Sequence, residues 1–329
     1  MSKFKVFLTR KIPQKSIDYL LEHEIDLKLN EENRVLTKEE ILEGVKGIDG
    51  LICLLTDQID DEIIESAGSQ LKIIANYAVG YNNIDVEAAT KRNIPVTNTP
   101  GVLTETTADF TIALLLSIAR KIVESDSFTR AGKFEGWGPL LQLGTDVFGK
   151  TIGIIGCGRI GSAVARRAVK GFNMKAIYYD TTRHPDIEKE LGMEYQSLNQ
   201  VLTKSDFISL HVPLTENTKH LIDRNELSLM KETAYLVNTS RGAVINEQAL
   251  LDVLEKKQIA GAALDVFEFE PEITSGLEKL DNVIITAHIA SASIETRTKM
   301  GMIAVENLLS VLKNKKPPNC VNPEIYQKK

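Results

Sequence analysis

Short apolar runs alternate with amphipathic stretches along almost the whole chain. In the first hundred residues, strands are predicted where four to six apolar and β-branched residues stand together, at 5–8, 50–55, 72–75 and 95–98. Apolar residues spaced three and four apart predict intervening helices at 16–22, 61–67 and 86–92. Buried strands that alternate with helices are typical of a parallel sheet covered on both faces.

The alternation of short strands and helices stops after Pro100, and a single long helical pattern covers residues 104–131. Its middle, 108–119, is apolar almost all round, which predicts a buried helix. It could be a core helix of one domain or a helix packed against a second subunit, and its length and uniform apolarity favour the second. A glycine-rich loop follows, and the alternation then resumes with strands predicted at 151–156, 175–179, 207–212, 235–238, 261–266 and 283–286. Helices fit between these strands, most clearly at 247–257, and an amphipathic helix at 293–313 precedes a polar tail.

Length and composition limit the class of protein. A chain of 329 residues with 43% hydrophobic residues can build about two domains. With 39 basic and 45 acidic residues, the net charge of −6 argues against a nucleic-acid or anionic-membrane surface, because either partner needs a basic face. The three cysteines (Cys53, Cys157 and Cys320) are too few and too scattered for disulfides or a metal cluster. We therefore expect a soluble, cytoplasmic protein without a metal, a secretory signal or a membrane span.

The strongest local motif is G-x-G-x-x-G, formed by Gly156, Gly158 and Gly161 between a predicted strand and a predicted helix. In a dinucleotide site the first glycine permits a tight turn, the second lets the backbone approach the pyrophosphate, and the third lets helix and strand pack closely. Asp180 ends the next predicted strand, where a carboxylate would accept hydrogen bonds from the ribose of NAD. That carboxylate repels a 2′-phosphate and favours NAD(H), whereas the nearby Arg183 leaves NADP(H) open.

Three polar residues follow predicted strands in the second half of the chain: Arg241, Glu270 and His288. Each alone could be a surface ion-pair partner, a loop carboxylate or a structural histidine, but a nicotinamide site nearby favours catalysis. Reduction of a 2-oxo acid needs a guanidinium to hold the carboxylate and carbonyl oxygens, which suits Arg241. It also needs an acid to protonate the developing alkoxide, which suits His288. Glu270 would orient that imidazole and favour its charged form.

Several segments resemble the D-isomer-specific 2-hydroxyacid dehydrogenase family, and the likeness covers nearly the whole chain. They are GYNNID at 80–85, the glycine motif, NTSRG at 238–242, LDVF at 264–267 and the His288 loop. Within the family the chain is most similar to the glyoxylate/hydroxypyruvate reductase branch, through residues 50–55, 96–104 and 136–140. The resemblance implies an α/β fold of two doubly wound parallel-sheet domains. A Rossmann-type NAD-binding domain (99–288), which includes a dimerisation helix and loop at about 101–148, is inserted into a flavodoxin-like substrate domain (1–98 and 289–329), with the active site in the cleft between them.

The resemblance also implies further site residues. The amides of Val79 and Gly80 would hold the substrate carboxylate, Leu55 would line the pocket, and Trp137 would enter the site of the neighbouring subunit of a homodimer. Trp137 could equally be a core tryptophan. The remaining residues would contact the cofactor: Thr107 on the long helix, Arg159 and Ile160 at the pyrophosphate, His211, Val212 and Pro213 at the adenine end, and Thr239 and Asp265 near the nicotinamide. Thr218, Ser240, His288 and Ala290 are further predicted cofactor contacts.

The sequence departs from the family pattern at a few positions. Ala287 and Ala290 stand where proline and glycine are common around the catalytic histidine, so Ala290 could narrow the pocket or shift His288. Asn82 replaces a common aspartate. We expect reduction of glyoxylate, and also of hydroxypyruvate, by NADH. The open alternatives are D-lactate or phosphoglycerate dehydrogenase activity and an NAD(H)-sensing role like that of the family's corepressors. Formate dehydrogenase relatives carry glutamine where Glu270 stands, which argues against that activity.

Overall fold

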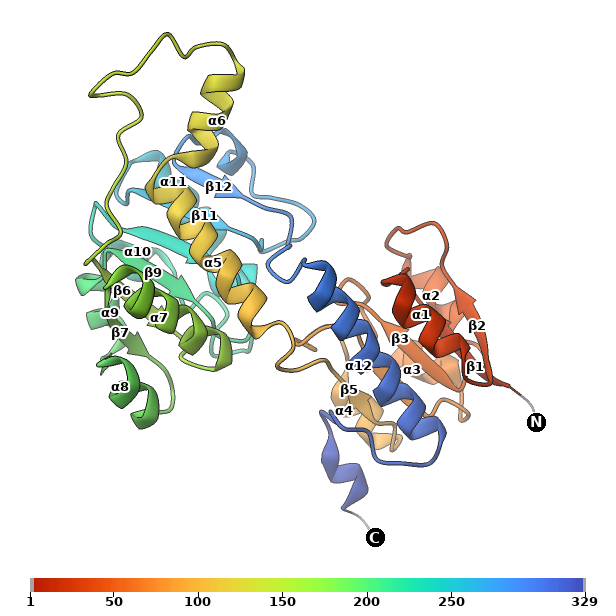
Figure 1. Ribbon diagram of the computed structural model, residues 1–329. Coiled ribbons are helices and arrows are strands. Elements are labelled where there is room, and N and C mark those ends of the chain that lie inside the picture. The colour runs from red at the N-terminus through yellow and green to blue at the C-terminus, as the bar shows by residue number, and fades with distance from the viewer. Residues whose placement is uncertain (1–2, 328–329) are drawn as a thin grey trace. The chain divides into compact units, whose positions relative to one another are not determined.

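The computed structural model describes residues 3–327, which divide into two compact units. The first unit takes the chain up to Leu103 and again from Ala292 onward, and the second spans Thr104–Ser291. The sequence placed the boundaries at 98/99 and 288/289, so the two descriptions differ by a few residues at each crossing. Each unit has its own parallel sheet (Figure 1).

The first unit is a five-stranded parallel sheet in the order β2-β1-β3-β4-β5, the flavodoxin-like order. Its strands are β1 (Phe4–Leu8), β2 (Ile25–Leu29), β3 (Gly50–Cys53), β4 (Ile73–Asn76) and β5 (Val96–Thr97). Its helices are α1 (Gln14–Leu21), α2 (Lys38–Gly44), α3 (Asp61–Ala67), α4 (Val86–Lys91) and α12 (Ile294–Leu312). One buried cluster joins the sheet to α1 and α12, and another joins it to α2, α3 and α4, so helices cover both faces.

The last described residues protect the free edge of this sheet. Cys320 forms an antiparallel bridge with Thr97 of β5, just before the 3-10 helix η3 (Pro323–Tyr326). Val321 donates its N–H to the carbonyl of Val96 at 2.8 Å. The buried side chain of Asn322 accepts from the Val96 N–H at 2.8 Å and donates to the Ile94 carbonyl at 3.0 Å. These bonds satisfy backbone groups that an edge strand otherwise leaves open.

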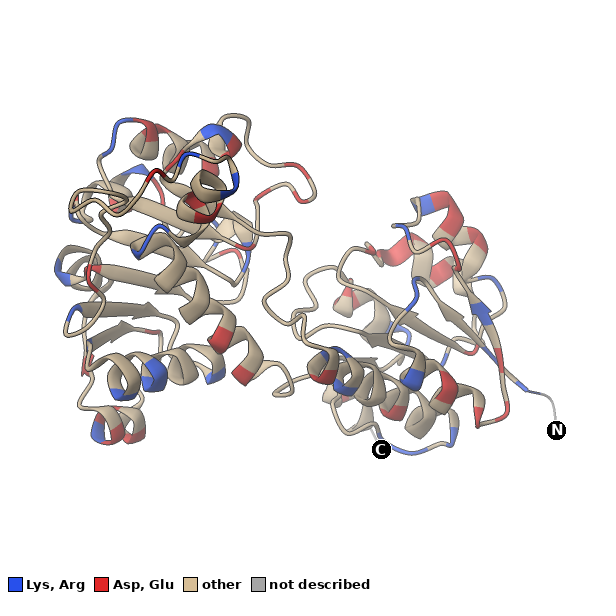
Figure 2. Ribbon diagram, turned by 45° about the horizontal axis from the view of Figure 1, so that its top comes forward, with Lys and Arg blue, Asp and Glu red and all other residues tan. Residues whose placement is uncertain are grey.

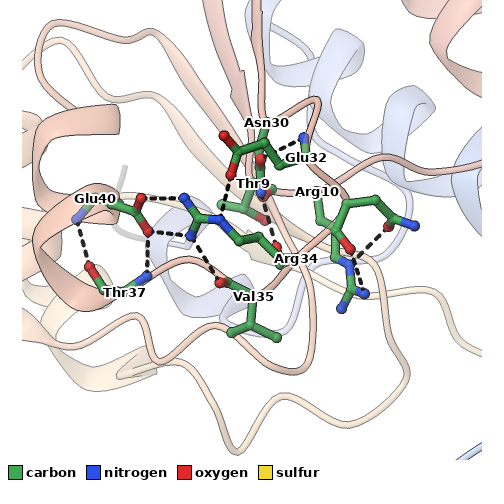
Figure 3. A network of polar contacts seen from close by, with 9 residues as sticks. Thr9, Arg10, Asn30, Glu32, Arg34, Val35, Thr37 and Glu40 are labelled. Carbon is green, nitrogen blue, oxygen red and sulfur yellow. Dashed lines mark hydrogen bonds and ion pairs between the residues drawn. The ribbon is translucent and has the colours of Figure 1, made fainter.

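Surface contacts hold the loop that follows β2 (Figure 3). The amide of Asn30 donates to the carbonyls of Thr9 and Arg34, both at 3.0 Å, and so ties this loop to the end of β1. The Arg34 guanidinium binds both carboxylate oxygens of Glu40, which also closes a capping box with Thr37 at the start of α2. Because these side chains are exposed, their charge pairing adds little stability, and they mainly fix the loop's path.

The second unit is a seven-stranded parallel sheet in the order β12-β11-β10-β9-β6-β7-β8. Its strands are β6 (Thr151–Ile155), β7 (Lys175–Tyr179), β8 (Glu194–Tyr195), β9 (Phe207–Leu210), β10 (Tyr235–Asn238), β11 (Gly261–Leu264) and β12 (Val283–Ile285). Its helices are α5 (Thr104–Ala119), α6 (Ile122–Arg130), α7 (Arg159–Phe172), α8 (Pro185–Leu191), α9 (Leu198–Lys204), α10 (Arg224–Ser228) and α11 (Glu247–Glu255), with short 3-10 turns η1 (Gly242–Val244) and η2 (Leu277–Lys279). The chain order along the sheet reverses between β6 and β9, which is the switch point where α/β sheets bind ligands.

The strands of both sheets are mostly free of charged residues, which lie chiefly on helices and loops (Figure 2). This matches the continuous apolar runs from which buried parallel strands were predicted. Between residues 3 and 327, no helix is both long and apolar enough to cross a membrane.

The single helix predicted at 104–131 is wrong: the structure has two helices, α5 and α6, with a break between them. Lys121 adopts a left-handed backbone conformation with φ of 53°, which ends α5. The loop that returns at residues 144–145 contacts the end of α5, where the Thr145 N–H donates to the Ala119 carbonyl at 2.7 Å. A Cβ at Gly144 would lie 2.3 Å from the same carbonyl oxygen, so the two segments are in close contact. The returning loop therefore caps α5 where the sequence pattern showed no interruption. α5 is largely buried, as predicted, whereas α6 has no buried residue.

Candidate active site

The glycine motif forms the turn between β6 and α7. Gly156 has φ of 90°, and a Cβ there would lie 2.7 Å from the carbonyl carbon of His211, so no larger residue fits. A Cβ at Gly161 would lie 2.1 Å from the Gly156 carbonyl, which shows how closely the helix approaches the turn. By contrast, nothing stands within 4 Å of a Cβ at Gly158. Open space at the second glycine and tight packing at the other two fit a pyrophosphate cradle.

The start of α7 supplies the amides of this cradle. No side chain caps the helix, and its first turn, with Arg159 and Ile160, has no acidic residue. The first N–H groups of a helix have no partner within the helix and carry its positive dipole end, which favours an anion. The residues present therefore fit the diphosphate of a dinucleotide.

Asp180 directly follows β7 and is tied to the glycine turn. Its carboxylate accepts the N–H of Cys157 at 2.7 Å and the N–H of Thr182 at 3.2 Å. Burial raises the pKa of Asp180, but these two backbone donors and the nearby His184 outweigh it, so the pKa lies below its ordinary value. Asp180 is therefore a carboxylate at neutral pH, next to the cradle. The nearby Arg183 forms an ion pair with Glu188, with Nε and Oε1 2.8 Å apart, and not with Asp180.

The loop after β9 borders the other side of the glycine turn. His211 packs against Gly156, and its Nε2 lies 2.8 Å from the Ser209 hydroxyl. Burial lowers the pKa of His211 to about 3, so the imidazole is neutral. The Thr218 hydroxyl donates to the Pro213 carbonyl at 2.6 Å and closes this loop on itself. The structure thus brings His211, Val212, Pro213 and Thr218 into one loop, and their contact with adenine stays a prediction.

His288 and Glu270 form a hydrogen-bonded pair in the loops beyond β12 and β11. The His288 Nδ1 lies 2.9 Å from Glu270 Oε2, and the other carboxylate oxygen accepts the Phe267 N–H at 3.1 Å. Burial raises the pKa of Glu270, but His288, the Phe267 amide and Arg241 outweigh it and hold the pKa below its usual range. The ionised carboxylate binds Nδ1 of the ring and leaves Nε2 to act as the acid or base.

Arg241 lies just beyond β10, the strand next to β11 in the sheet. Its Nη1 donates to the Ser240 carbonyl at 2.7 Å. Burial lowers the pKa of its guanidinium, and the charge of Glu270 opposes that change. Arg241, Glu270 and His288 therefore follow three neighbouring strands, β10, β11 and β12, at the carboxyl edge of one sheet.

Asp265 anchors the turn that carries His288. Its fully buried carboxylate accepts hydrogen bonds from the N–H groups of Ile289 at 2.8 Å and Ala290 at 2.7 Å, and from the Thr286 hydroxyl at 2.7 Å. Its carbonyl also accepts the His288 N–H at 2.8 Å. These bonds hold His288 in a left-handed conformation with φ of 53°, which is uncommon for a residue other than glycine. The sequence pointed to Asp265 as a nicotinamide contact and missed this positioning role.

The structure also clarifies the departure at Ala290. Its side chain is buried, and Ala290 is not among the residues with positive φ in the described part of the chain. The methyl group therefore adds no backbone strain where relatives commonly have glycine.

Other predicted cofactor residues gather around the end of β10. The hydroxyls of Thr239 and Thr111 lie 2.8 Å apart, and Thr111 also donates to the Thr107 carbonyl one turn earlier on α5. Asn238 accepts the Ser240 N–H at 3.0 Å and donates to the Arg241 carbonyl at 2.9 Å. Asn238 was not predicted as a site residue, although a buried asparagine at a strand end is the signal that could have found it.

The predicted carboxylate-binding loop belongs to the first unit. The carbonyls of Val79 and Gly80 accept side-chain amides of Asn98 and Asn76, each at 2.8 Å. Within residues 3–327 the N–H groups of Val79 and Gly80 form no hydrogen bond, which suits an anion-binding loop. Leu55 is half-buried in the neighbouring loop after β3.

Trp137 is 86% exposed, so it is not a core residue of this chain. It belongs to an unusually apolar surface on α6 and the loop after it. The other exposed large side chains of this surface are Ile122, Val123, Phe134, Leu140, Leu141, Leu143 and Phe148.

Comparison with known proteins identifies the family. Residues 112–290 match the family model described as "D-isomer specific 2-hydroxyacid dehydrogenase, NAD binding domain". The chain belongs to this family. A glyoxylate reductase from Korarchaeum cryptofilum is 53% identical over 327 residues, covering 99% of this chain and 98% of the relative.

Solved structures of other proteins are also similar to this chain over nearly its whole length. A crystal structure of a protein from Thermus thermophilus has a TM-score of 0.91 at 44% identity and covers 97% of this chain and 100% of its own. An NADPH-dependent glyoxylate/hydroxypyruvate reductase from Sinorhizobium meliloti, in complex with NADP and malonate, has a TM-score of 0.85 at 32% identity, with 97% of each chain covered. The chain is thus an oxidoreductase of the 2-hydroxyacid dehydrogenase family that acts on a small 2-oxo acid, with two parallel-sheet α/β domains as predicted.

Proposed function

We propose that the protein reduces glyoxylate, and also hydroxypyruvate, to the corresponding 2-hydroxy acid with NADH. The observation that carries the proposal is the His288–Glu270 pair at 2.9 Å, which lies with Arg241 after three neighbouring strands of the same sheet that carries the glycine cradle. The glyoxylate reductase at 53% identity supports the choice of substrate.

The three residues divide the chemistry. A nicotinamide dinucleotide, when bound, supplies the hydride that adds to the keto carbon of the substrate. Arg241 holds the substrate carboxylate and carbonyl oxygen through its planar, two-pronged guanidinium. His288 gives the proton on Nε2 to the oxygen of the former carbonyl, while Glu270 keeps the ring oriented and stabilises its charged form. The substrate gains one hydride and one proton, and becomes the 2-hydroxy acid.

Asp180 supports a preference for NADH. Its pKa is held below the ordinary value, so a full negative charge stands where the adenosine ribose would lie, and that charge repels a 2′-phosphate. Arg183, the nearest cation along the chain, is paired with Glu188 and does not offset this charge. The Sinorhizobium relative is NADPH-dependent, so the cofactor choice needs its own measurement.

We also propose a homodimer through α6 and residues 131–148. Several large apolar side chains of this segment are exposed, among them Trp137, Leu140 and Phe148, which a single copy leaves in contact with water. A second copy would bury them, and the partner's loop would bring Trp137 towards the neighbouring site. A cytoplasmic location accords with this proposal.

The decisive test compares wild type with His288→Asn. Initial rates of NADH oxidation are measured with glyoxylate, hydroxypyruvate, pyruvate and 3-phosphohydroxypyruvate, and NADH binding is measured by fluorescence titration. The proposal expects glyoxylate to give the highest kcat/KM, and His288→Asn to lose at least about a hundredfold in kcat while still binding NADH. If His288→Asn keeps near-normal turnover, His288 is not the acid that protonates the substrate. An inactive wild type that binds NADH would favour the sensor role instead.

A further inference from the structure

Two carboxylates outside the proposed catalytic set form a reciprocal clasp in the second unit. Glu247 is the first residue of α11, and Glu268 lies in the loop after β11. The Glu268 N–H donates to Glu247 Oε1 at 3.1 Å, and the Glu247 N–H donates to Glu268 Oε2 at 3.3 Å. Each side chain thus binds the backbone of the other segment.

Further contacts complete the clasp. His220 Nε2 lies 2.6 Å from Glu268 Oε1, and Glu247 Oε2 accepts both the N–H and the hydroxyl of Thr274. Glu247 is only 2% exposed, and the Glu268 side chain 10%. Burying two neighbouring carboxylates costs free energy unless hydrogen-bond donors surround them. Here the donors come from His220, from the start of α11 and from the loop after β11, so the hydrogen bonds join these three segments to one another.

The clasped segments are the ones that carry Arg241 and Glu270. Arg241 and η1 lead directly into Glu247, and Glu268 precedes Glu270 by two residues. A Cβ at Gly242 would lie 1.8 Å from the Phe267 carbonyl carbon and 2.4 Å from the Glu268 nitrogen, so the two backbones are in direct contact. His220 is held to the same region, because its N–H donates to the Ala243 carbonyl at 2.8 Å.

We propose that His220, Glu247 and Glu268 are positioning residues that set the distance between Arg241 and the His288–Glu270 pair. This inference rests on the proposed function, because it assumes that these groups act on one substrate. The clasp residues do not touch the substrate. Glu268 fixes the position of the backbone whose Phe267 N–H donates a hydrogen bond to Glu270. His220 in turn donates a hydrogen bond to Oε1 of Glu268 and holds that carboxylate in place. Displacement of a reacting group by about 1 Å is enough to cost about a hundredfold in rate.

The main experiment compares Glu268→Gln with a matched control, Asp252→Asn. Asp252 is also a carboxylate of α11 and is paired with a cation, Arg224, at 2.6 Å, but its hydrogen-bond partners are Arg224 and Gln248 and not the clasped loops. We expect Glu268→Gln to lower kcat about 10- to 100-fold with little change in NADH binding, because glutamine has a single oxygen and its NH2 group cannot accept a hydrogen bond from either the Glu247 N–H or the His220 ring. Asp252→Asn should keep kcat within about twofold.

A second pair of variants separates positioning from mere stability. His220→Gln retains a donor for Glu268, whereas His220→Ala does not, so His220→Gln should keep several-fold more kcat than His220→Ala. The thermal midpoint is measured for both. If Glu268→Gln and His220→Ala lower the melting temperature but keep wild-type kcat, or if the two His220 variants lose kcat equally, the inference is wrong. Should Glu268→Gln fail to fold, the His220 pair still decides.

The outcomes also separate this inference from the proposed function. A wild type that reduces no 2-oxo acid refutes the proposed function. An active wild type, together with His288→Asn inactive and the clasp variants fully active, refutes the positioning role alone.

Discussion

Replacing Glu270 by glutamine tests how the carboxylate controls the proposed acid. Glutamine keeps the shape but has one oxygen, whereas Glu270 accepts from His288 at 2.9 Å and from the Phe267 N–H at 3.1 Å. One of these two bonds must therefore be lost, and the negative charge disappears. A hydrogen bond to a charged partner contributes about 1.5–3 kcal/mol, and about 1.4 kcal/mol corresponds to one pH unit.

The negative charge of Glu270 stabilises the positively charged ring of His288, so its removal should lower the rate of reduction. Because the pKa of Glu270 lies below its usual range, Glu270 is ionised throughout the neutral region and does not itself limit activity there. The Glu270→Gln variant lacks this charge at every pH, so the hydrogen-bonded pair loses its ionic partner. The rate of the variant at neutral pH should therefore be about 10- to 100-fold lower.

The assay is the initial rate of NADH oxidation with glyoxylate from about pH 5.5 to 9, with Glu232→Gln, an exposed residue of the same unit, as control. The loss should stay about the same over this range, because the lowered pKa of Glu270 keeps the wild-type carboxylate ionised throughout it. An unchanged profile would refute the pairing altogether.

Other substitutions test the cofactor site and the apolar surface. Asp180→Ala should raise the NADPH/NADH ratio of kcat/KM by about tenfold or more, since it removes a charge from the 2′-phosphate position; an unchanged ratio contradicts the role of Asp180. Gly156→Ala should weaken NADH binding at least about tenfold and lower the melting temperature, because the residue has φ of 90° and its Cβ would meet His211; native binding by fluorescence titration would show that the turn can relax. Trp137→Ala should shift the dimer–monomer equilibrium in sedimentation velocity and lower kcat; a stable dimer with full activity places Trp137 outside the interface and the site.

Strong local patterns were enough to predict much of the fold. The glycine motif, with a strand before it and a helix after it, gave β6 and α7 because backbone geometry and close packing leave little choice at Gly156 and Gly161. Strands β7 and β10 and helix α3 have the predicted bounds because they are short, apolar or amphipathic, and clearly delimited.

Elements with weaker patterns were missed. The edge strand β2 alternates apolar and charged residues in only five positions, Ile25–Leu29, of which only Ile25 is buried, and it is defined by its pairing with β1. The break between α5 and α6 depends on a loop returning from residues 144–145, which no local pattern reveals. Both features are set by tertiary contacts.

The candidate site shows the same division. Arg241, Glu270 and His288 were found because their chemistry is distinctive and each follows a strand. The residues that hold them in place, Asn238 and the Glu247–Glu268 clasp, were not found. Their roles depend on which backbone N–H each side chain reaches, and that is decided by how separate loops meet.

The discontinuous first unit has a consequence for biosynthesis. Its sheet needs α12 on one face and Cys320 at its edge, yet both are synthesised after the inserted second unit. The inserted second unit, Thr104–Ser291, is complete before then and can fold while the chain is still growing. The part of the first unit that precedes Thr104 is synthesised earlier, and it keeps an apolar face uncovered until α12 is made. A chain that stalls or is truncated shortly before Ile294 would therefore carry a finished dinucleotide domain and an aggregation-prone half-domain, which is a natural target for chaperones during synthesis.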